Sequence, residues 1–175
     1  MRRAHSQKGI TLLEIVIALA LIGIVSLAAS VTYQQVILFT AVSNDENRAV
    51  NQVVNAQHWI ARDVAGANPA SINDTPAAPA FFSLTRREWG SGSFDSHTIE
   101  YLLQPGASAG LKELWREYDG TQRTFVAKNI KAREDGVTDC EWDATREVLI
   151  VVVTAQVGRE TETRRFEAEV VPDAT

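Results

Sequence analysis

Apolar residues crowd the N-terminal part of the chain. The segment from Ile15 to Val31 is almost continuously apolar, and no charged residue occurs between Ile15 and Asn44. A helix needs roughly 20 apolar residues to cross the hydrocarbon core of a bilayer, and this charge-free stretch supplies them. We therefore expect the chain to begin with a membrane-spanning helix.

Beyond this stretch the pattern becomes that of an amphipathic helix. Polar and charged residues occupy the other faces of this helix. Apolar residues recur at close to helical spacing, at Val50, Val53, Ile60 and Val64. Gly66 and the pair Asn68-Pro69 predict the end of the helix. A single helix from Ile10 to Ala65 would be about 80 Å long at 1.5 Å per residue.

The apolar period changes to two after a loop between Ala65 and Ala80 that is rich in Ala, Asn, Ser and Pro. This spacing predicts strands at 97–103, 112–118, 123–128, 147–157 and 164–171. The unbroken apolar run 148–153 predicts a buried central strand, and the last strand should have one wet face. We predict an α+β fold in which a long N-terminal helix, membrane-spanning in its first half and amphipathic in its second, packs on an antiparallel sheet.

Composition narrows the classes of function. The 175 residues hold 17 basic and 22 acidic side chains, a net charge of −5, which argues against a nucleic-acid partner. Cys140 is the one cysteine, which excludes an intrachain disulfide and any zinc site built from paired cysteines. We expect no cofactor.

The charges around the apolar segment predict its orientation. Arg2, Arg3 and Lys8 precede it, which places the N-terminus in the cytoplasm and the rest outside the inner membrane. A secretory signal peptide has the same order of regions, but its apolar core is typically shorter. Glu14 adds a second distinction, because a carboxylate costs on the order of 2.5–3.5 kcal/mol at mid-membrane and is then a functional candidate. A solvated Glu14 near the headgroups is the alternative, and position alone leaves both open.

The segment Lys8-Gly9-Ile10-Thr11-Leu12-Leu13-Glu14 resembles the leader junction of type IV pilins and type II secretion pseudopilins. The resemblance implies that a prepilin peptidase cuts between Gly9 and Ile10 and N-methylates Ile10. Glu14 then becomes the fifth residue of the mature chain, where it neutralises the amino terminus of a neighbouring subunit and sets the register of a filament. A contact between Ile10 and Glu14 within one helix is the alternative. The sequence departs from the family at Ile10, where phenylalanine is usual, and near Val31, where many major pilins have a proline.

The resemblance also divides the chain into segments. Residues 1–9 would be the leader, 10–38 the membrane-spanning or filament-core half of the helix, 39–66 its amphipathic half, and 67–175 a β-rich domain on the periplasmic or extracellular side. Removal of the leader would take away Arg2, Arg3 and Lys8, leaving 14 basic and 22 acidic residues and a net charge of −8.

Short segments of the C-terminal half resemble one subgroup, the J-type minor pseudopilins, with the W-type minor pilins close behind. These segments are Leu84–Trp89, Thr98–Leu102, Leu114–Tyr118 and Val126–Ile130. The resemblance implies a minor subunit at the tip of a type II secretion pseudopilus that serves protein export. The family's terminal tip subunit lacks the glutamate matching Glu14, so this chain would lie below it.

The implied partners are the prepilin peptidase, other minor and major pseudopilins, the inner-membrane assembly platform and the membrane. Three alternatives stay open: a type IV pilus minor pilin that primes assembly for adhesion, twitching or DNA uptake, a DNA-uptake pseudopilin, and an ordinary single-span protein with an external binding domain. Gene neighbours, not this sequence, would separate the first two.

The sequence holds no pattern typical of an enzyme site, and we expect none. Ser96 and His97 are adjacent, and neighbouring residues on a strand point to opposite faces, which disfavours a Ser–His–carboxylate site. Carboxylates cluster around Gly136 and would suit calcium by chemistry but not by spacing, so a solvated acidic loop is favoured. These carboxylates are Glu134, Asp135, Asp139, Glu141 and Asp143.

Overall fold

A computed structural model of the chain describes residues 11–90, 92–133 and 137–171, which fall into two units divided after Ser43. The first unit consists of the N-terminal part of α1 (Leu12–Ala65), and the second, which we call the head unit, comprises residues 44–171. The described part of α1 is one continuous helix, as predicted, and it ends at Ala65, as Gly66 and Asn68-Pro69 indicate.

The first unit exposes apolar side chains all round. Every residue from Thr11 to Val42 is exposed, and the most apolar window of α1 has a mean hydropathy of 2.7 with none of it buried. A helix of this length and composition is consistent with a single membrane-spanning anchor.

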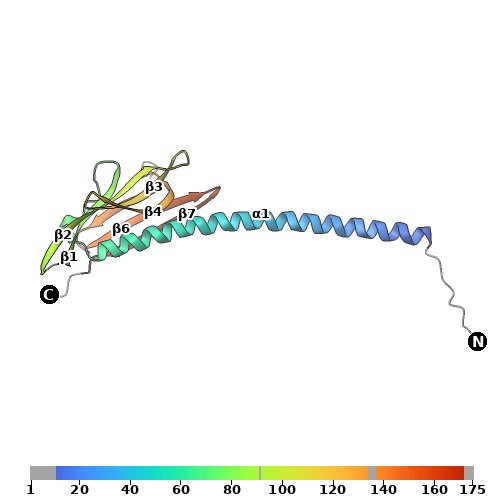
Figure 1. The fold of residues 1–175 in the computed structure, drawn as a ribbon, viewed down its shortest axis with the longest axis horizontal. Helices are drawn as coiled ribbons and strands as arrows, with labels where there is room; N and C mark the ends of the chain where they lie inside the picture. Colours follow the sequence, from blue (N-terminus) through green and yellow to red (C-terminus); the bar gives the residue numbers. More distant parts are fainter. Residues whose placement is uncertain (1–10, 91, 134–136, 172–175) are drawn as a thin grey trace, which may run out of the picture. The chain divides into compact units, whose positions relative to one another are not determined.

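The head unit holds an antiparallel sheet of seven strands in the order β1-β2-β3-β4-β6-β5, with β7 paired to β6 (Figure 1). A short 3-10 helix, η1 (Pro69–Ser71), leads from α1 to the sheet. The strands are β1 (Ala80–Gly90), β2 (Ser93–Pro105), β3 (Leu111–Tyr118), β4 (Gln122–Lys131), β5 (Asp139–Asp143), β6 (Val148–Val157) and β7 (Glu160–Glu169). The predicted α+β class, a long helix packed on an antiparallel sheet, is confirmed.

The last strands follow the apolar pattern closely. The strand β6 pairs with β4, β5 and β7, as expected of a buried central strand. In β7, Phe166 and Ala168 are buried while Arg165 and Glu167 are exposed, which confirms the predicted wet face.

The acidic segment differs from its prediction. Residues 139–143 form the edge strand β5 on β6 and are not a loop. Cys140 is buried and Trp142 packs against the core, whereas Asp139 and Glu141 face solvent. The acidic side chains are therefore the wet face of a two-sided strand.

The second half of α1 packs on the sheet through small and branched side chains. Its buried apolar residues are Ala49, Val53, Ala56, Ile60 and Val64. At the sheet, Gln52 Oε1 accepts a hydrogen bond of 2.8 Å from the N–H of Lys128, and Asn55 Nδ2 donates to the carbonyl of Val126. These amides satisfy backbone groups of β4 next to a register shift between β3 and β4.

Candidate processing and assembly site

Thr11 caps the start of α1. The backbone N–H of Glu14 lies 3.0 Å from the carbonyl oxygen of Thr11 and 3.3 Å from Thr11 Oγ1. A threonine hydroxyl that accepts from the third helical residue is an N-cap, and Thr-x-x-Glu is the spacing of a capping box. Our sequence reasoning missed this role of Thr11, although a threonine three residues before a glutamate at the start of an apolar run signals it.

Glu14 itself is exposed at the first turn. A carboxylate there is favoured by the partial positive charge of the helix N-terminus. The other residues of the predicted site, Gly9, Ile10, Arg2, Arg3 and Lys8, lie outside the described residues, so cleavage, methylation and the pairing of Glu14 with an amino terminus stay predictions.

Hydroxyl groups on the exposed part of α1 bond to their own helix. Ser30 Oγ donates to the carbonyl of Ser26 at 2.9 Å, and Thr32 Oγ1 donates to that of Ala28 at 2.9 Å. Thr40 Oγ1 does the same to Val36 at 2.7 Å. Polar groups in hydrocarbon must be satisfied internally, so these hydroxyls suit both a bilayer and an apolar helix neighbour.

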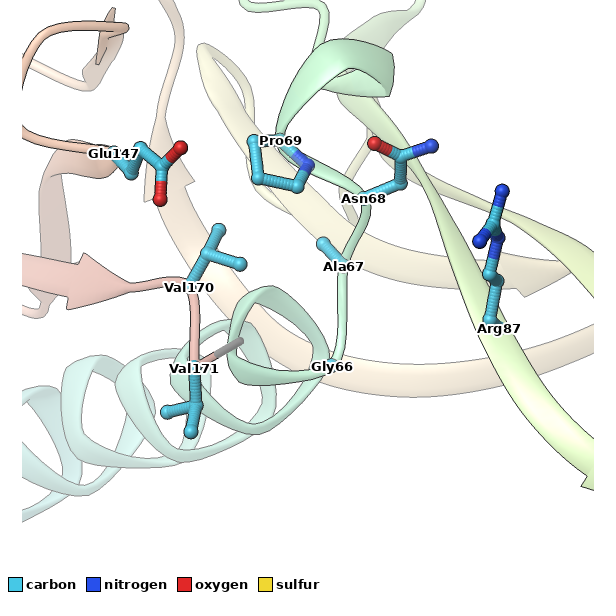
Figure 2. A pocket seen from close by; sticks show the side chains of 8 residues that line it. All are labelled: Gly66, Ala67, Asn68, Pro69, Arg87, Glu147, Val170 and Val171. Atoms are coloured by element: carbon cyan, nitrogen blue, oxygen red, sulfur yellow. The ribbon is translucent and has the colours of Figure 1, made fainter. Parts of the chain in front are cut away.

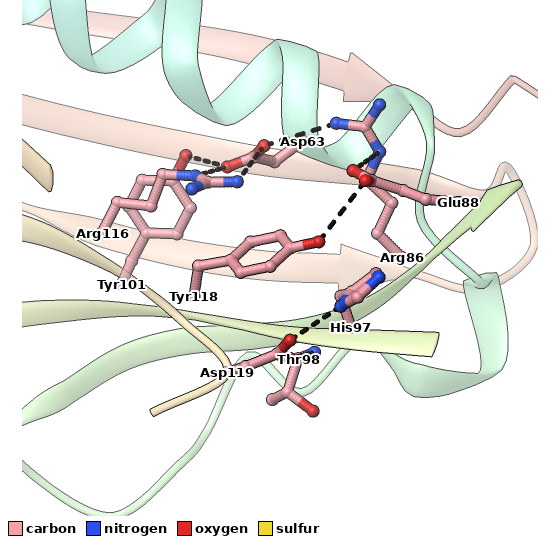
Figure 3. Close-up of polar contacts among 9 residues, drawn as sticks. All are labelled: Asp63, Arg86, Glu88, His97, Thr98, Tyr101, Arg116, Tyr118 and Asp119. Atoms are coloured by element: carbon pink, nitrogen blue, oxygen red, sulfur yellow. Dashed lines mark hydrogen bonds and ion pairs between the residues drawn. The ribbon is translucent and has the colours of Figure 1, made fainter. Parts of the chain in front are cut away.

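The head unit is held to its helix by a buried ion cluster around Asp63, whose side chain is 1% exposed (Figure 3). Arg116 donates from Nε to Asp63 Oδ2 at 2.6 Å and from Nη2 to Oδ1 at 3.0 Å, and the hydroxyl of Tyr101 donates to Oδ2 at 2.7 Å. The Nη1 of Arg86 lies 3.9 Å from Oδ1. Bidentate pairing of this kind compensates for the loss of water around a buried charge.

The same cluster limits the space at Gly66 and raises the pKa of Tyr101. A Cβ on Gly66 would lie 2.9 Å from Arg86 Nε, so a side chain there would push the guanidinium away. Arg86 Nε lies 3.4 Å from Glu88 Oε1, within the range of an ion pair. It makes no hydrogen bond with a described residue. Burial, together with the neighbouring carboxylate of Asp63, raises the pKa of Tyr101 well above its usual range.

Aromatic rings and guanidinium groups extend the cluster toward the surface. The Arg116 guanidinium lies 5.5 Å from the ring centroid of Trp59 and 5.3 Å from that of Tyr118. The ring of His97 stacks on Tyr118 with centroids 4.9 Å apart. Cation–π contacts and ring stacking therefore connect α1, β3 and β2.

His97 is bonded to Asp119 rather than to a serine. Its Nδ1 lies 2.7 Å from Asp119 Oδ2, while Asp119 Oδ1 accepts from the N–H of Thr98 at 2.8 Å (Figure 3). The hydrogen bond with Asp119 raises the pKa of His97 and lowers that of Asp119. Within the described part of the chain, no hydrogen bond joins His97 to Ser96 or to another hydroxyl. The contacts of Asp119 with His97 and Thr98 instead hold the turn that follows β3 against β2.

A cavity of about 470 Å³ lies at the end of α1 (Figure 2). The N–H of Val171 donates to the carbonyl of Ala65 at 3.0 Å and so satisfies one of the last carbonyls of the helix. Arg87 and Glu147 are its charged lining residues, and the rest of the lining is Gly66, Ala67, Asn68, Pro69, Val170 and Val171. This lining combines no nucleophile with a base.

Cys140 and the described carboxylates of the acidic segment are held by burial and by contacts within the fold. Burial raises the pKa of Cys140 to about 12, which leaves it a thiol at neutral pH. Asp139 pairs with Arg133 at 3.1 Å, and Asp143 accepts from the N–H groups of Thr145 and Arg146. Asp135 and Glu134 lie outside the described residues, and the described His, Cys, Asp and Glu side chains form no group of three that would hold a metal ion.

Comparison with known proteins bears on the N-terminal segment. Residues 4–30 match the family model of the prokaryotic N-terminal methylation motif, and the match includes Gly9, Ile10 and Glu14. No curated protein and no solved structure matches the chain. The motif, the exposed apolar helix and the pilin-like α+β architecture together support a place for the chain among type IV pilin-like proteins, as a pilin or a pseudopilin.

Proposed function

We propose that this chain is a minor pseudopilin, most like the J-type, and that it forms part of the tip of a type II secretion pseudopilus. The observation that carries the proposal is the methylation motif at residues 4–30, placed directly before an exposed apolar helix. The subgroup rests on the resemblance of the four short segments in the sheet. A W-type minor pilin of a type IV pilus is the alternative.

The proposed work of the chain is assembly. Prepilin peptidase removes residues 1–9 and methylates Ile10, and the apolar helix then moves from lipid into the core of a filament. There the carboxylate of Glu14 meets the amino terminus of a neighbouring subunit. In an apolar core such a pair is little screened, so it favours one axial register over others. The head unit lies on the periplasmic side and catalyses no reaction.

The experiment is co-expression of the full chain with a prepilin peptidase, followed by intact mass and N-terminal sequencing. We expect a chain that begins at Ile10 and carries one added methyl group. An uncut N-terminus would contradict the pilin class, and a cut beyond Ser26 would indicate a secretory signal.

Glu14→Ala tests the register. We expect this variant to be cleaved normally but recovered in sheared filaments at about a tenth of the wild-type level or less, because an amino terminus in an apolar core is left without its counter-ion. Glu46→Ala removes an exposed carboxylate of the same helix and is the matched control. Normal incorporation of Glu14→Ala would remove the register argument.

A further inference from the structure

The head unit has an apolar pocket where the loop before β1 meets β2, β3 and the segment after β4. Its volume is about 220 Å³. Phe81 and Ala132 are buried in its lining, whereas Ala78 and Pro79 are exposed. We call it the proline pocket, and its apolar lining includes Pro76, Ala78, Pro79, Phe81, Leu103 and Ala132.

The size of the proline pocket suits one side chain better than a whole small molecule. Sites for cofactors and drug-sized ligands measure about 300–1,000 Å³ and bury most of the ligand. A protein partner, in contrast, can be anchored by a single side chain that fills a desolvated pocket. The volume and the apolar lining together favour an aliphatic side chain of a partner protein.

Two cationic side chains, Lys112 and Arg133, also line the pocket, and no described lining residue is acidic. Arg133 is used by the fold: its Nε donates to Asp139 at 3.1 Å, and its Nη atoms donate to the carbonyls of Phe81 and Asp74 at 3.2 and 2.9 Å. Lys112 is half-buried, and its ammonium makes no ion pair or hydrogen bond with another described residue. This free ammonium beside an apolar lining is complementary to a carboxylate.

An aliphatic side chain and a carboxylate fit into so small a space when both belong to one residue. In an extended segment, neighbouring side chains point to opposite sides, so an internal acidic residue would not enter the pocket together with the aliphatic residue next to it. A C-terminal residue carries its side chain and its α-carboxylate on the same Cα. Capture of a C-terminal carboxylate is one of the recurring modes of peptide recognition.

We propose that the proline pocket binds the C-terminal residue of a partner protein. The aliphatic side chain of that residue packs against Phe81, Leu103 and Ala132, and its α-carboxylate pairs with Lys112. The inference goes beyond the proposed function, because the pocket belongs to the head unit and uses neither Glu14 nor the removal of the leader. Its failure would therefore leave the proposed role in assembly as it is.

N-acetyl-leucine is the probe, because it carries the aliphatic side chain, the amide and the free carboxylate of a C-terminal leucine. N-acetyl-leucine amide lacks the carboxylate and is the matched control. Each is titrated into the full chain in detergent micelles, with the methyl groups of leucine and alanine labelled for nuclear magnetic resonance. We expect N-acetyl-leucine to give saturable shifts of the Leu103 and Ala132 methyl signals, and the amide to bind at least about tenfold more weakly.

Two pairs of variants locate the binding. Lys112→Gln should weaken N-acetyl-leucine at least about tenfold, whereas Lys128→Gln, which removes an exposed charge from β4, should not change its affinity. Ala78→Trp places a large ring on the exposed part of the lining and should abolish binding. Ala77→Trp places the same ring on an exposed neighbour outside the lining and should leave binding unchanged.

Three results would overturn the proposal. The first is equal binding of N-acetyl-leucine and its amide, a comparison made on the unaltered chain and so independent of how any variant folds. The second is unchanged affinity in Lys112→Gln. The third is binding of hexanoate at least about tenfold tighter than that of N-acetyl-leucine, because the occupant would then be a fatty acid and not the end of a protein chain.

Discussion

His97 and Asp119 make the stability of the head unit depend on pH, with one limit in the acid range and one above the ordinary pKa of histidine. The pKa of His97 is raised by its hydrogen bond to Asp119, so the pair's contribution is complete below the ordinary pKa of histidine and is lost as the pH rises through the raised value. The pKa of Asp119 is lowered, so the contribution is present above the ordinary pKa of aspartate and is lost as the pH falls through the lowered value. The pair is therefore strongest between these two limits.

Replacement of Asp119 tests this assignment. In Asp119→Asn the carboxylate that stabilises the charged imidazole is gone, so we expect the pKa of His97 to fall toward its ordinary value of 6.5. The measurement is a titration of the imidazole signals by nuclear magnetic resonance on the full chain in detergent micelles, with His97→Gln to assign the signal. Identical His97 titrations in both proteins would contradict the assignment.

At the scale of elements, the Asp63 cluster joins α1 to β1, β2 and β3. Asp63→Asn leaves Arg116, whose side chain is 11% exposed, without its carboxylate. Loss of one partner of a buried ion pair costs about 3–5 kcal/mol, and we expect the free energy of unfolding to fall by that amount. Denaturant unfolding of the full chain in micelles, followed by circular dichroism, measures the change.

The matched control is another ion-paired aspartate that faces solvent. Asp139 pairs with Arg133 but its side chain is 61% exposed, so Asp139→Asn should cost about 1 kcal/mol or less. Equal losses in the two variants would mean that the Asp63 cluster is no more important to the fold than a surface ion pair.

Sequence patterns predicted the elements whose local signals agree with their tertiary surroundings. The end of α1 follows from Gly66 and Asn68-Pro69, and β6 follows from its unbroken apolar run. The period of two failed for β1, because a register shift between Ala80 and Phe82 lets Phe81 and Phe82 both be buried. It also failed for the start of β7, where Glu160, Glu162 and Arg164 occupy the face that carries the buried Phe166 and Ala168 further along the strand.

Of the candidate functional residues, Glu14 could be predicted from the sequence and the Asp63 cluster could not. Glu14 was predicted from its motif, since a carboxylate beside an apolar run is visible in one dimension. Asp63 is also a lone acid, and it occupies the buried helical face three residues after Ile60. Its partners Tyr101 and Arg116 lie on two strands far along the chain, so the ion cluster exists only once the sheet has formed.

At the scale of the whole molecule, charge is divided unequally on the two sides of the apolar helix. Arg2, Arg3 and Lys8 precede the charge-free segment from Ile15 to Asn44, and the first basic residue after that segment is Arg48. Basic residues near the ends of a span set its orientation, whereas acidic residues contribute little. We therefore expect Arg2, Arg3 and Lys8 to keep the N-terminus in the cytoplasm and to place the head unit in the periplasm.

Neutralising the leader should remove this bias. With Arg2→Gln, Arg3→Gln and Lys8→Gln, Arg48 is the basic residue closest to the span, and we expect a substantial part of the chain to retain its head unit in the cytoplasm. Protease added to spheroplasts, which digests periplasmic domains, measures that part. Arg87→Gln, Arg123→Gln and Arg159→Gln remove as much charge far from the span and should leave the head unit fully digestible. If the head unit is also fully digested in the variant without Arg2, Arg3 and Lys8, the orientation of the chain does not depend on these three cations.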